Sequence, residues 1–219
     1  MGIPTWFRPR FIQSKPLLDN LLLDKSIRDY LTALNALDHE IYIHSQRVCQ
    51  LSLDLGIENG FKAVYIRDLG IASLLHDIGK TRLPRHLLIK TESLDQDEFQ
   101  TLRGHVRLGF LALADIQPAS IKEIVVGHHE YSINPYPRNG VDRRQIKRKS
   151  NERRRHKPVI NQITQILAAA DMADALASKR CYKEGYSRDK LAATMRAEFR
   201  GDQRYVDQVL NRQPNLSWS

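Results

Sequence analysis

Apolar residues recur three and four positions apart through most of the chain, and this spacing limits what it can fold into. One such series is Ile41, His44, Val48, Leu51 and Leu55, which has the period of a single helix face. The same spacing returns at 121–128 and 160–174, and no stretch alternates with period two for long. The sequence therefore predicts an all-α fold, a helical bundle with one core.

The predicted helices follow one another with short breaks. Gly56 is expected to end the helix that begins at residue 39, and Gly79 to supply a turn. We divide the chain into an N-terminal arm with short helices (1–38), a main domain (39–200), and a C-terminal helix and tail (201–219). The expected helices cover 17–23, 26–37, 39–55, 61–76, a short one starting at 93–95, 101–115, one opened by Pro118, 159–177, 188–199 and 202–210.

Composition excludes several classes of protein. No apolar run approaches the roughly 20 residues that span a bilayer, and residues 1–16 contain no apolar signal core. Cys49 and Cys181 are the only cysteines, which favours a reducing compartment over a disulfide scaffold. We therefore expect a cytoplasmic protein without a transmembrane segment.

Histidines and aspartates stand on the apolar faces or at the ends of successive predicted helices. A lone histidine in such a place is usually a core residue with a satisfied hydrogen bond. Burying the whole set without partners would be costly, whereas a metal cluster satisfies its members together. The candidate ligands are His44, His76, Asp77, His105, His128, His129 and Asp171.

Nitrogen and carboxylate ligands without cysteine suit Fe, Mn or Zn. The set exceeds what one ion needs, so two ions that share the Asp77 carboxylate are favoured. Two ions about 3.5–4 Å apart activate a bridging water and hold a phosphate oxygen, which points to metal-assisted hydrolysis. Asp77 would orient that water and Lys80 would assist the leaving oxygen; the alternative for Lys80 is a solvated lysine at a helix end.

These motifs, in this order, resemble those of the HD superfamily of metal-dependent phosphohydrolases. Within it they resemble the HD-GYP branch, whose members cleave cyclic di-GMP. The similarity covers roughly residues 36–200. The matching stretches are His76-Asp77-Ile78-Gly79-Lys80, His105 followed by Gly109, His128-His129-Glu130, the run from Ala170 to Leu176, and Arg180-Cys181-Tyr182-Lys183.

The resemblance implies the same seven metal ligands and a catalytic role for Lys80. It also implies that Glu40 is a further ligand in members with three metals, so two or three ions of Fe or Mn are expected. Arg180 and Lys183 would hold substrate phosphates, as suits a ligand with two phosphodiester charges. Cations also stabilise a helix C-terminus, and that explanation of Arg180 and Lys183 stays open.

One loop departs from the branch. Its signature has Gly-Tyr-Pro after His-His-Glu and a spacer, whereas this chain has Asn134-Pro135-Tyr136-Pro137 with a spacer one residue shorter. Glycine adopts backbone angles that proline forbids, so the loop takes another path. This degenerate loop affects substrate choice and partner contacts but contains no metal ligand.

The net charge of +9 is concentrated in one insert, residues 138–157. That insert holds ten Lys or Arg and two acidic residues, a net charge of +8, and no aromatic residue. It is expected to be an exposed mobile loop or a surface helix. Binding to nucleic acid, to anionic lipid or to a protein, steering of an anionic substrate, and plain solvation all remain open, although base stacking is disfavoured.

These observations predict a signalling hydrolase, a metal-dependent phosphodiesterase of the HD-GYP type. Its expected reaction is attack by a metal-bound hydroxide on cyclic di-GMP or a related cyclic dinucleotide, giving the linear dinucleotide or continuing to GMP. One alternative is an HD phosphohydrolase acting on another nucleotide, which the altered loop motivates. The other is a non-catalytic signalling scaffold that binds a nucleotide.

Overall fold

The computed structural model describes residues 14–90, 92–135, 153–178 and 185–212, and helices dominate these ranges. The regular elements are α1 (Ser14–Leu23), α2 (Lys25–Leu37), α3 (His39–Glu58), α4 (Ala63–Leu75), the 3-10 helix η1 (Ile78–Arg82), α5 (Arg85–Ile89), α6 (Gln96–Arg103), α7 (His105–Ala112), α8 (Ala119–Gly127), α9 (Arg153–Ala177), α10 (Arg188–Glu198) and α11 (Gln203–Arg212). Within these ranges the only β-type pairing is an isolated bridge between Ser132 and Phe199. The predicted all-α class is confirmed.

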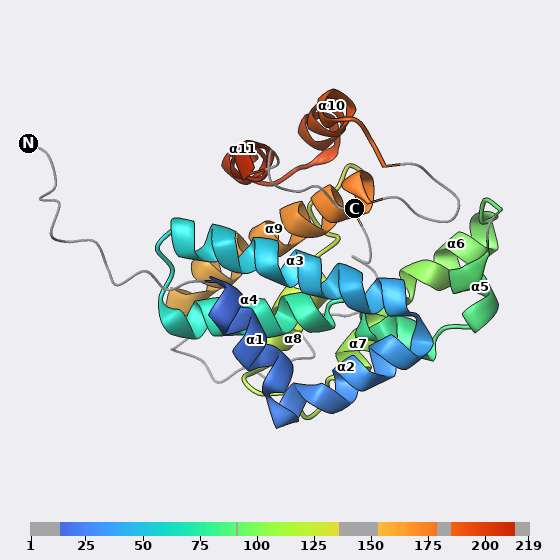
Figure 1. Ribbon diagram of the computed structural model, residues 1–219, viewed down its shortest axis with the longest axis horizontal. Coiled ribbons are helices and arrows are strands. Elements are labelled where there is room, and N and C mark those ends of the chain that lie inside the picture. The colour runs from blue at the N-terminus through green and yellow to red at the C-terminus, as the bar shows by residue number, and fades with distance from the viewer. Residues whose placement is uncertain (1–13, 91, 136–152, 179–184, 213–219) are drawn as a thin grey trace, which may run out of the picture.

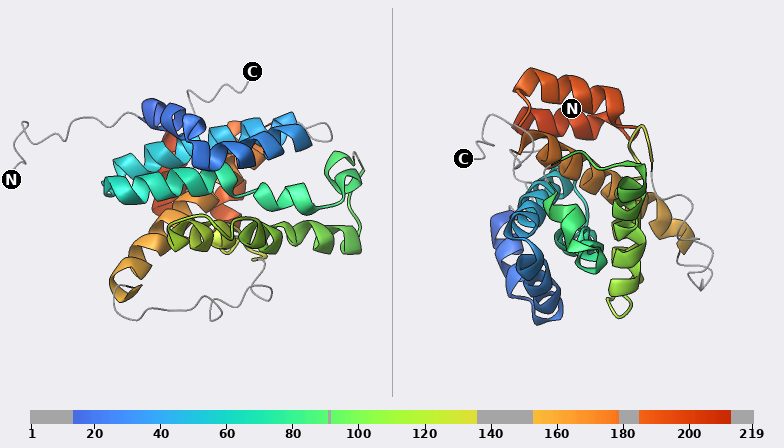
Figure 2. Two further views of the ribbon diagram at one scale, coloured as in Figure 1. Left: turned by 90° about the horizontal axis from the view of Figure 1, so that it is seen from below. Right: turned by 90° about the vertical axis from the view of Figure 1, so that its right-hand side faces the viewer.

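The centre of the bundle is formed by α3, α4, α8 and α9, which pack on one another (Figure 1). Helices α1 and α2 cover α3 on one side, and α10 and α11 lie across α9 on the other (Figures 1 and 2). Their apolar faces meet in one continuous core that includes Leu21 of α1, Leu34 of α2 and Val209 of α11. The arm and the C-terminal helix therefore pack with the central helices, while the division at residues 38 and 200 stays a prediction.

Polar caps fix where several helices begin. The Asp38 carboxylate accepts hydrogen bonds from the backbone N–H groups of Glu40 and Ile41 at the start of α3. At α6, Asp95 and Glu98 form a capping box, in which each side chain accepts from the other residue's backbone N–H. These caps satisfy amides that the first turn of a helix leaves without partners.

Three predicted boundaries are wrong for local reasons. Helix α3 continues past Gly56, which is buried against Leu69 of α4, and the chain turns only at Gly60, whose φ is +69°. The predicted helix at 101–115 is broken at Gly104, so that α6 and α7 are separate. Helix α9 begins at Arg153 rather than near residue 159 and continues across Pro158. The short helix α5 has no predicted counterpart.

Residues 136–152 carry most of the basic insert and lie outside the described residues, as do Tyr136 and Pro137 of the altered loop. The last five residues of the insert form the first turns of α9. No helix in the described ranges combines the length and the apolar character that crossing a membrane requires. Cys49 is buried and carries a free thiol, and Cys181 is outside the described part of the chain.

Candidate metal centre

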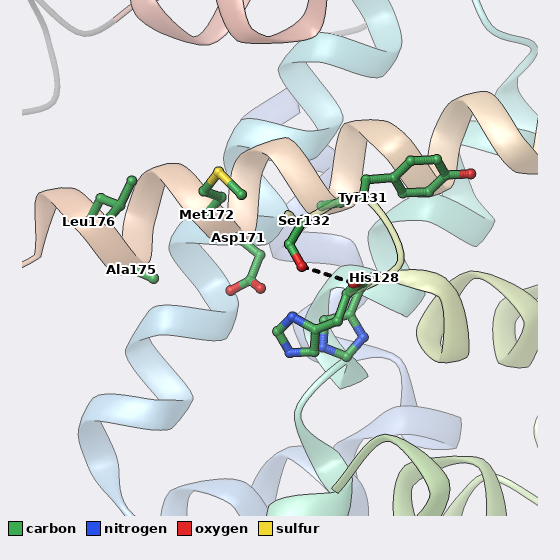
Figure 3. A pocket seen from close by; sticks show the side chains of 9 residues that line it. His128, Tyr131, Ser132, Asp171, Met172, Ala175 and Leu176 are labelled. Carbon is green, nitrogen blue, oxygen red and sulfur yellow. Dashed lines mark hydrogen bonds between the residues drawn. The ribbon is translucent and has the colours of Figure 1, made fainter. Parts of the chain in front are cut away.

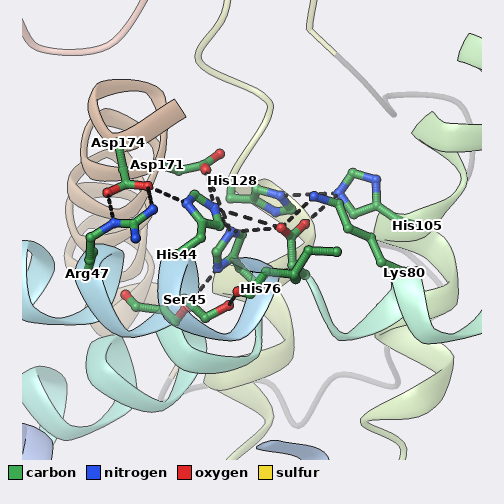
Figure 4. Close-up of polar contacts among 12 residues, drawn as sticks. His44, Ser45, Arg47, His76, Lys80, His105, His128, Asp171 and Asp174 are labelled. Carbon is green, nitrogen blue, oxygen red and sulfur yellow. Dashed lines mark hydrogen bonds and ion pairs between the residues drawn. The ribbon is translucent and has the colours of Figure 1, made fainter. Parts of the chain in front are cut away.

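Helix ends in three parts of the chain and one residue inside a helix bring the candidate ligands together. His76 and Asp77 lie between α4 and η1, His105 is the first residue of α7, and His128 follows the last residue of α8. His44 projects from the second turn of α3. These five side chains are at most 7% exposed. Figure 4 shows the four histidines converging with Asp171 of α9.

The first ligand group consists of His44, His76 and Asp77, whose ligand atoms all lie within 4.8 Å of one another. The two imidazole Nε2 atoms are 3.3 Å apart. Asp171 adds a carboxylate to this group, since its Oδ1 lies 3.2 Å from Nε2 of His44 and 3.6 Å from Nε2 of His76. The first ligand group thus contains two histidines and two carboxylates.

The second ligand group consists of His105, His128 and His129, with ligand atoms within the same 4.8 Å limit. The Nε2 atoms of His105 and His128 are 3.5 Å apart, and the rings of His128 and His129 have centroids 4.0 Å apart. This group contains imidazoles alone.

Asp77 joins the two groups through its two oxygens. Its Oδ2 lies 3.5 Å from Nε2 of His76 and 3.8 Å from Nε2 of His44, whereas its Oδ1 lies 3.5 Å from Nε2 of His105. Lys80 donates a 2.6 Å hydrogen bond to the same Oδ2 from the next turn. The two oxygens of Asp77 therefore face different ligand groups.

Hydrogen bonds on the outer side orient most of these rings. Nδ1 of His76, His105 and His128 each donates to the backbone carbonyl three residues earlier, at 2.8, 2.8 and 2.5 Å. A carbonyl only accepts, so the proton is on Nδ1, and Nε2 presents a lone pair to the centre. Each of these rings is therefore oriented by a backbone carbonyl three residues before it in the chain.

His44 is held differently, by a side chain to which the sequence assigns no role. Its Nδ1 donates to Oδ2 of Asp174 at 2.6 Å. Arg47 pairs with the same carboxylate through Nε at 2.7 Å and Nη2 at 3.0 Å. The helical spacing of α9 puts Asp174 on the same face as Asp171, and this was the available signal.

Burial and neighbouring charges shift the acidity of the centre. Burial opposes the charge on His44, but the hydrogen-bonded carboxylates of Asp171 and Asp174 outweigh it and raise the pKa to about 9. Burial, reinforced by its histidine neighbours, holds the pKa of His128 well below its ordinary value. Burial also lowers the pKa of His129, to about 3. The second ligand group is thus neutral at pH 7.

The two aspartates of the centre are ionised. Burial alone would raise the pKa of Asp77, but the nearby Lys80 and the histidines hold it well below its ordinary range. Burial likewise opposes the charge on Asp171, but the hydrogen bond from His44 outweighs it and holds the pKa of Asp171 well below its ordinary value. Anionic carboxylate oxygens and the neutral imidazoles of the second group are ligand types that suit divalent cations.

A close backbone contact fixes the distance between the two groups. A Cβ atom on Gly79 of η1 would lie 1.8 Å from the carbonyl oxygen of His105 and 2.4 Å from the amide nitrogen of Gly109. Only glycine permits η1 and α7 to approach this closely. Because Asp77 precedes η1 and His105 begins α7, this contact sets the reach from Asp77 to the second ligand group.

The remaining predicted site residues lie apart from these groups. Glu40 is exposed at the start of α3, one turn before His44, and belongs to neither group. Arg180 and Lys183 fall outside the described residues. The described flanks of their segment are Ser178 and Gly185. The amide of the next residue, Tyr186, donates to the carbonyl of Leu176 near the end of α9.

A small pocket of about 180 Å³ opens beside the centre (Figure 3). The candidate ligands His128, His129 and Asp171 form part of its wall, and the rest comes from one face of α9 and the segment after His129. Those further lining residues are Tyr131, Ser132, Ala168, Met172, Ala175 and Leu176. The pocket gives a molecule from solvent access to the edge of the ligand cluster.

A metal ion fits the donor set. The neutral rings of His105 and His128 turn Nε2 lone pairs toward each other at 3.5 Å, and neither can donate to the other. A cation between such atoms removes that repulsion and satisfies the buried carboxylates as well. Imidazole and carboxylate donors without a thiolate suit Fe, Mn or Zn, and the geometry does not select among them.

Comparison with known proteins agrees with this site. The HD domain family matches residues 41–179, which include every candidate ligand except Glu40. The chain belongs to the HD domain family, so the resemblance seen in its motifs is confirmed. Phosphohydrolases of this family depend on metal ions, and the described cluster of histidines and aspartates could hold such ions.

Several characterised phosphodiesterases are similar to this chain in sequence. The chain is 33% identical to a cyclic di-GMP phosphodiesterase of Thermotoga maritima over 150 residues, 67% of this chain and 37% of that protein. It is 30% identical to a cyclic di-GMP phosphodiesterase of Pseudomonas aeruginosa over 174 residues, 78% of this chain and 38% of that protein. A 3'3'-cGAMP-specific phosphodiesterase of Vibrio cholerae is 28% identical over 189 residues, 82% of this chain and 33% of that protein. The matches thus span less than two fifths of each relative.

Proposed function

We propose that this chain is a metal-dependent phosphodiesterase of the HD-GYP type that opens a phosphodiester bond of cyclic di-GMP or a related cyclic dinucleotide. The observation that carries this proposal is the pair of buried ligand groups joined by Asp77 in a domain of the HD family. The relatives named as cyclic di-GMP and 3'3'-cGAMP phosphodiesterases support the substrate class.

Two Fe or Mn ions would be held by the two ligand groups, with Asp171 completing the first group. When bound, they supply an activated water and neutralise charge on the phosphate. A third ion would take Glu40 as a ligand, which requires its exposed side chain to turn toward the centre.

Within the chain itself, two residues are assigned to the chemistry. Asp77 lies between the groups, where a carboxylate orients a water for attack on phosphorus. Lys80 keeps its ammonium 2.6 Å from Asp77 and is only partly buried, so it is near enough to give a proton or a charge to the leaving oxygen. In the proposed reaction Asp77 orients the water and Lys80 assists the leaving oxygen.

The substrate would approach through the pocket beside Asp171. Arg180 and Lys183 are proposed to bind its phosphates, because guanidinium and ammonium groups pair well with phosphate oxygens. The described flanks of their segment lie near Leu176, which lines the pocket. The altered loop at Asn134 and Pro135 follows the same pocket wall, so it is the proposed determinant of which cyclic dinucleotide is preferred.

The test is a hydrolysis panel with protein purified without oxygen. Cyclic di-GMP, 3'3'-cGAMP, cyclic mononucleotides and nucleotide phosphates are incubated with the same metal-analysed sample, and products are separated by chromatography. Linear dinucleotide from a cyclic dinucleotide is the expected result. Turnover of another nucleotide alone would reassign the substrate, and metal-loaded protein that binds cyclic di-GMP without turnover would indicate a receptor.

A further inference from the structure

Asp174 is the most heavily hydrogen-bonded carboxylate described near the centre. It is 2% exposed and lies one helical turn after Asp171 on α9. Its Oδ2 accepts from Nδ1 of His44 at 2.6 Å, from Nη2 of Arg47 at 3.0 Å and from Oγ of Ser178 at 3.2 Å. Its Oδ1 accepts from Nε of Arg47 at 2.7 Å. Figure 4 shows this network outside the ligand cluster, on the far side of His44.

The partner of His44 differs in kind from those of the other oriented rings. His76, His105 and His128 donate from Nδ1 to neutral backbone carbonyls three residues earlier in the chain. His44 donates to an anion on another helix, 130 residues away in sequence. A carboxylate behind a ligating imidazole fixes its tautomer and makes Nε2 a stronger donor to a metal.

Arg47 determines how strongly that carboxylate acts. It comes from α3, one turn after His44, and binds Asp174 with two hydrogen bonds while also donating to Ser178 at 3.1 Å. This fork holds the carboxylate in one orientation and leaves Oδ2 facing Nδ1 of His44. The chain of contacts therefore runs from Arg47 through Asp174 to His44.

We infer that Asp174 is a positioning residue for metal, held by Arg47, which strengthens ion binding at the first ligand group and leaves the second group unaffected. The inference rests on the proposed two-metal centre and adds to it a selective dependence. A salt bridge that only ties α3 to α9 would stabilise the fold equally with and without metal and would not distinguish the two groups.

Asp174→Asn is the test, because the amide keeps the size and a hydrogen-bond acceptor but loses the negative charge. Mn²⁺ is titrated into metal-free protein, and bound ions per chain are counted at each free concentration. We expect one of the two ions to bind about 10- to 100-fold more weakly and the other to keep its affinity. Asp207→Asn, which alters an exposed pair with Arg196 on α10 and α11, is the matched control and should leave both affinities unchanged.

The outcomes separate this inference from the proposed function. Wild-type protein that binds no more than one Mn²⁺ would overturn both. Two ions in the wild type with equal or no weakening in Asp174→Asn would overturn the positioning role alone. The thermal midpoints of the metal-free proteins are measured in parallel, since a merely structural pair would lower stability without changing one affinity selectively.

A second measurement needs no variant of Asp174 and covers the case in which that variant fails to fold. Nitrogen NMR of the Zn²⁺-loaded wild-type protein reports which ring nitrogen of each histidine carries the proton. We expect His44 to carry it on Nδ1, with the proton shifted downfield relative to those of His76 and His128 by its carboxylate partner. A His44 Nδ1 proton with the shift of a carbonyl-bonded one, or none at all, would contradict the inference.

Discussion

The two ligand groups differ in the kinds of side chain that form them. The first, with His44, His76 and Asp77, mixes imidazoles with carboxylates and joins α3 to α9 through side chains. The second, with His105, His128 and His129, has imidazoles only, and two of them donate to backbone carbonyls three residues earlier in the chain.

This difference has a chemical consequence. Carboxylates raise the pKa of His44 to about 9, whereas burial depresses the pKa values in the second group. The second group is thus neutral and ready for an ion at pH 7, while the first holds a proton that an ion displaces. Asp77 couples the two, because one carboxylate faces both.

Removing the carboxylate that the two ligand groups share should have the largest effect, because it impairs both groups. Asp77→Ala is expected to abolish turnover, a loss well beyond the roughly 100-fold that the loss of an outer partner causes. Ion counting should show weaker binding at both groups, because each loses an oxygen. Metal-dependent hydrolysis that persists in this variant would sink the assignment of Asp77.

Substitutions at Lys80 test the chemical step separately from metal binding. Lys80→Met should lower kcat by about 100-fold or more, in the range for a lost general acid, while both ions remain bound. Lys80→Arg keeps a cation near Asp77 and is the matched control, with a smaller loss. Steady-state kinetics on samples of known metal content checks this. Loss of an ion in Lys80→Met would instead make the lysine a support for Asp77.

The glycine contact between η1 and α7 tests how rigidly the groups are spaced. Gly79→Ala should lower the free energy of unfolding by at least about 1–3 kcal/mol. The added methyl would clash with backbone atoms of α7, which can move only if the helix moves with them. Gly109→Ala is the control on the opposite side of the same contact. Its Cβ would meet its nearest atom at 3.5 Å, so a gain of about 0.4–1 kcal/mol is expected from a stiffer unfolded chain.

Those two glycine variants are compared by denaturant unfolding of the metal-free proteins. Equal stability changes in both would show that the contact does not constrain the spacing. A destabilised Gly79→Ala that still folds should also bind its second ion more weakly, since His105 is displaced relative to Asp77.

The smallest expected difference between the two ligand groups is the number of protons that each releases when it binds its ion. Because the pKa of His44 is raised to about 9, its ring is protonated at pH 7.5 without metal, and an ion must displace that proton. Filling the first group should release about one proton and filling the second none. Affinity at the first group therefore rises with pH up to about 9. Calorimetry in two buffers of different ionisation enthalpy counts the protons, and equal release in both steps would contradict the assignment.

The sequence predicts the fold class because the helical spacing is strong, and it groups the candidate ligands because they share inward faces. It misses the end of α3, since Gly56 serves there as a small packing residue against α4 rather than as a stop. Tertiary contact of this kind is not encoded in local spacing.

Asp174 illustrates the same limit within the site. The helical spacing predicts that Asp174 lies on the same inward face as Asp171. Its role, however, depends on Arg47, which is 127 residues away in sequence. The division of ligands into two unequal groups depends likewise on distances that only the folded chain provides. The roles of Glu40, Arg180 and Lys183, and the cytoplasmic location, stay predictions.

Turnover of cyclic di-GMP measured against the number of ions per chain tests the two-group centre most directly. Protein purified without oxygen is stripped, reloaded stepwise with Mn²⁺ or Fe²⁺, and assayed for linear product at each metal content. The account predicts little activity up to one ion per chain and a steep rise as the second ion binds. Full activity with a single ion, or none with both groups filled on any cyclic dinucleotide, would contradict it.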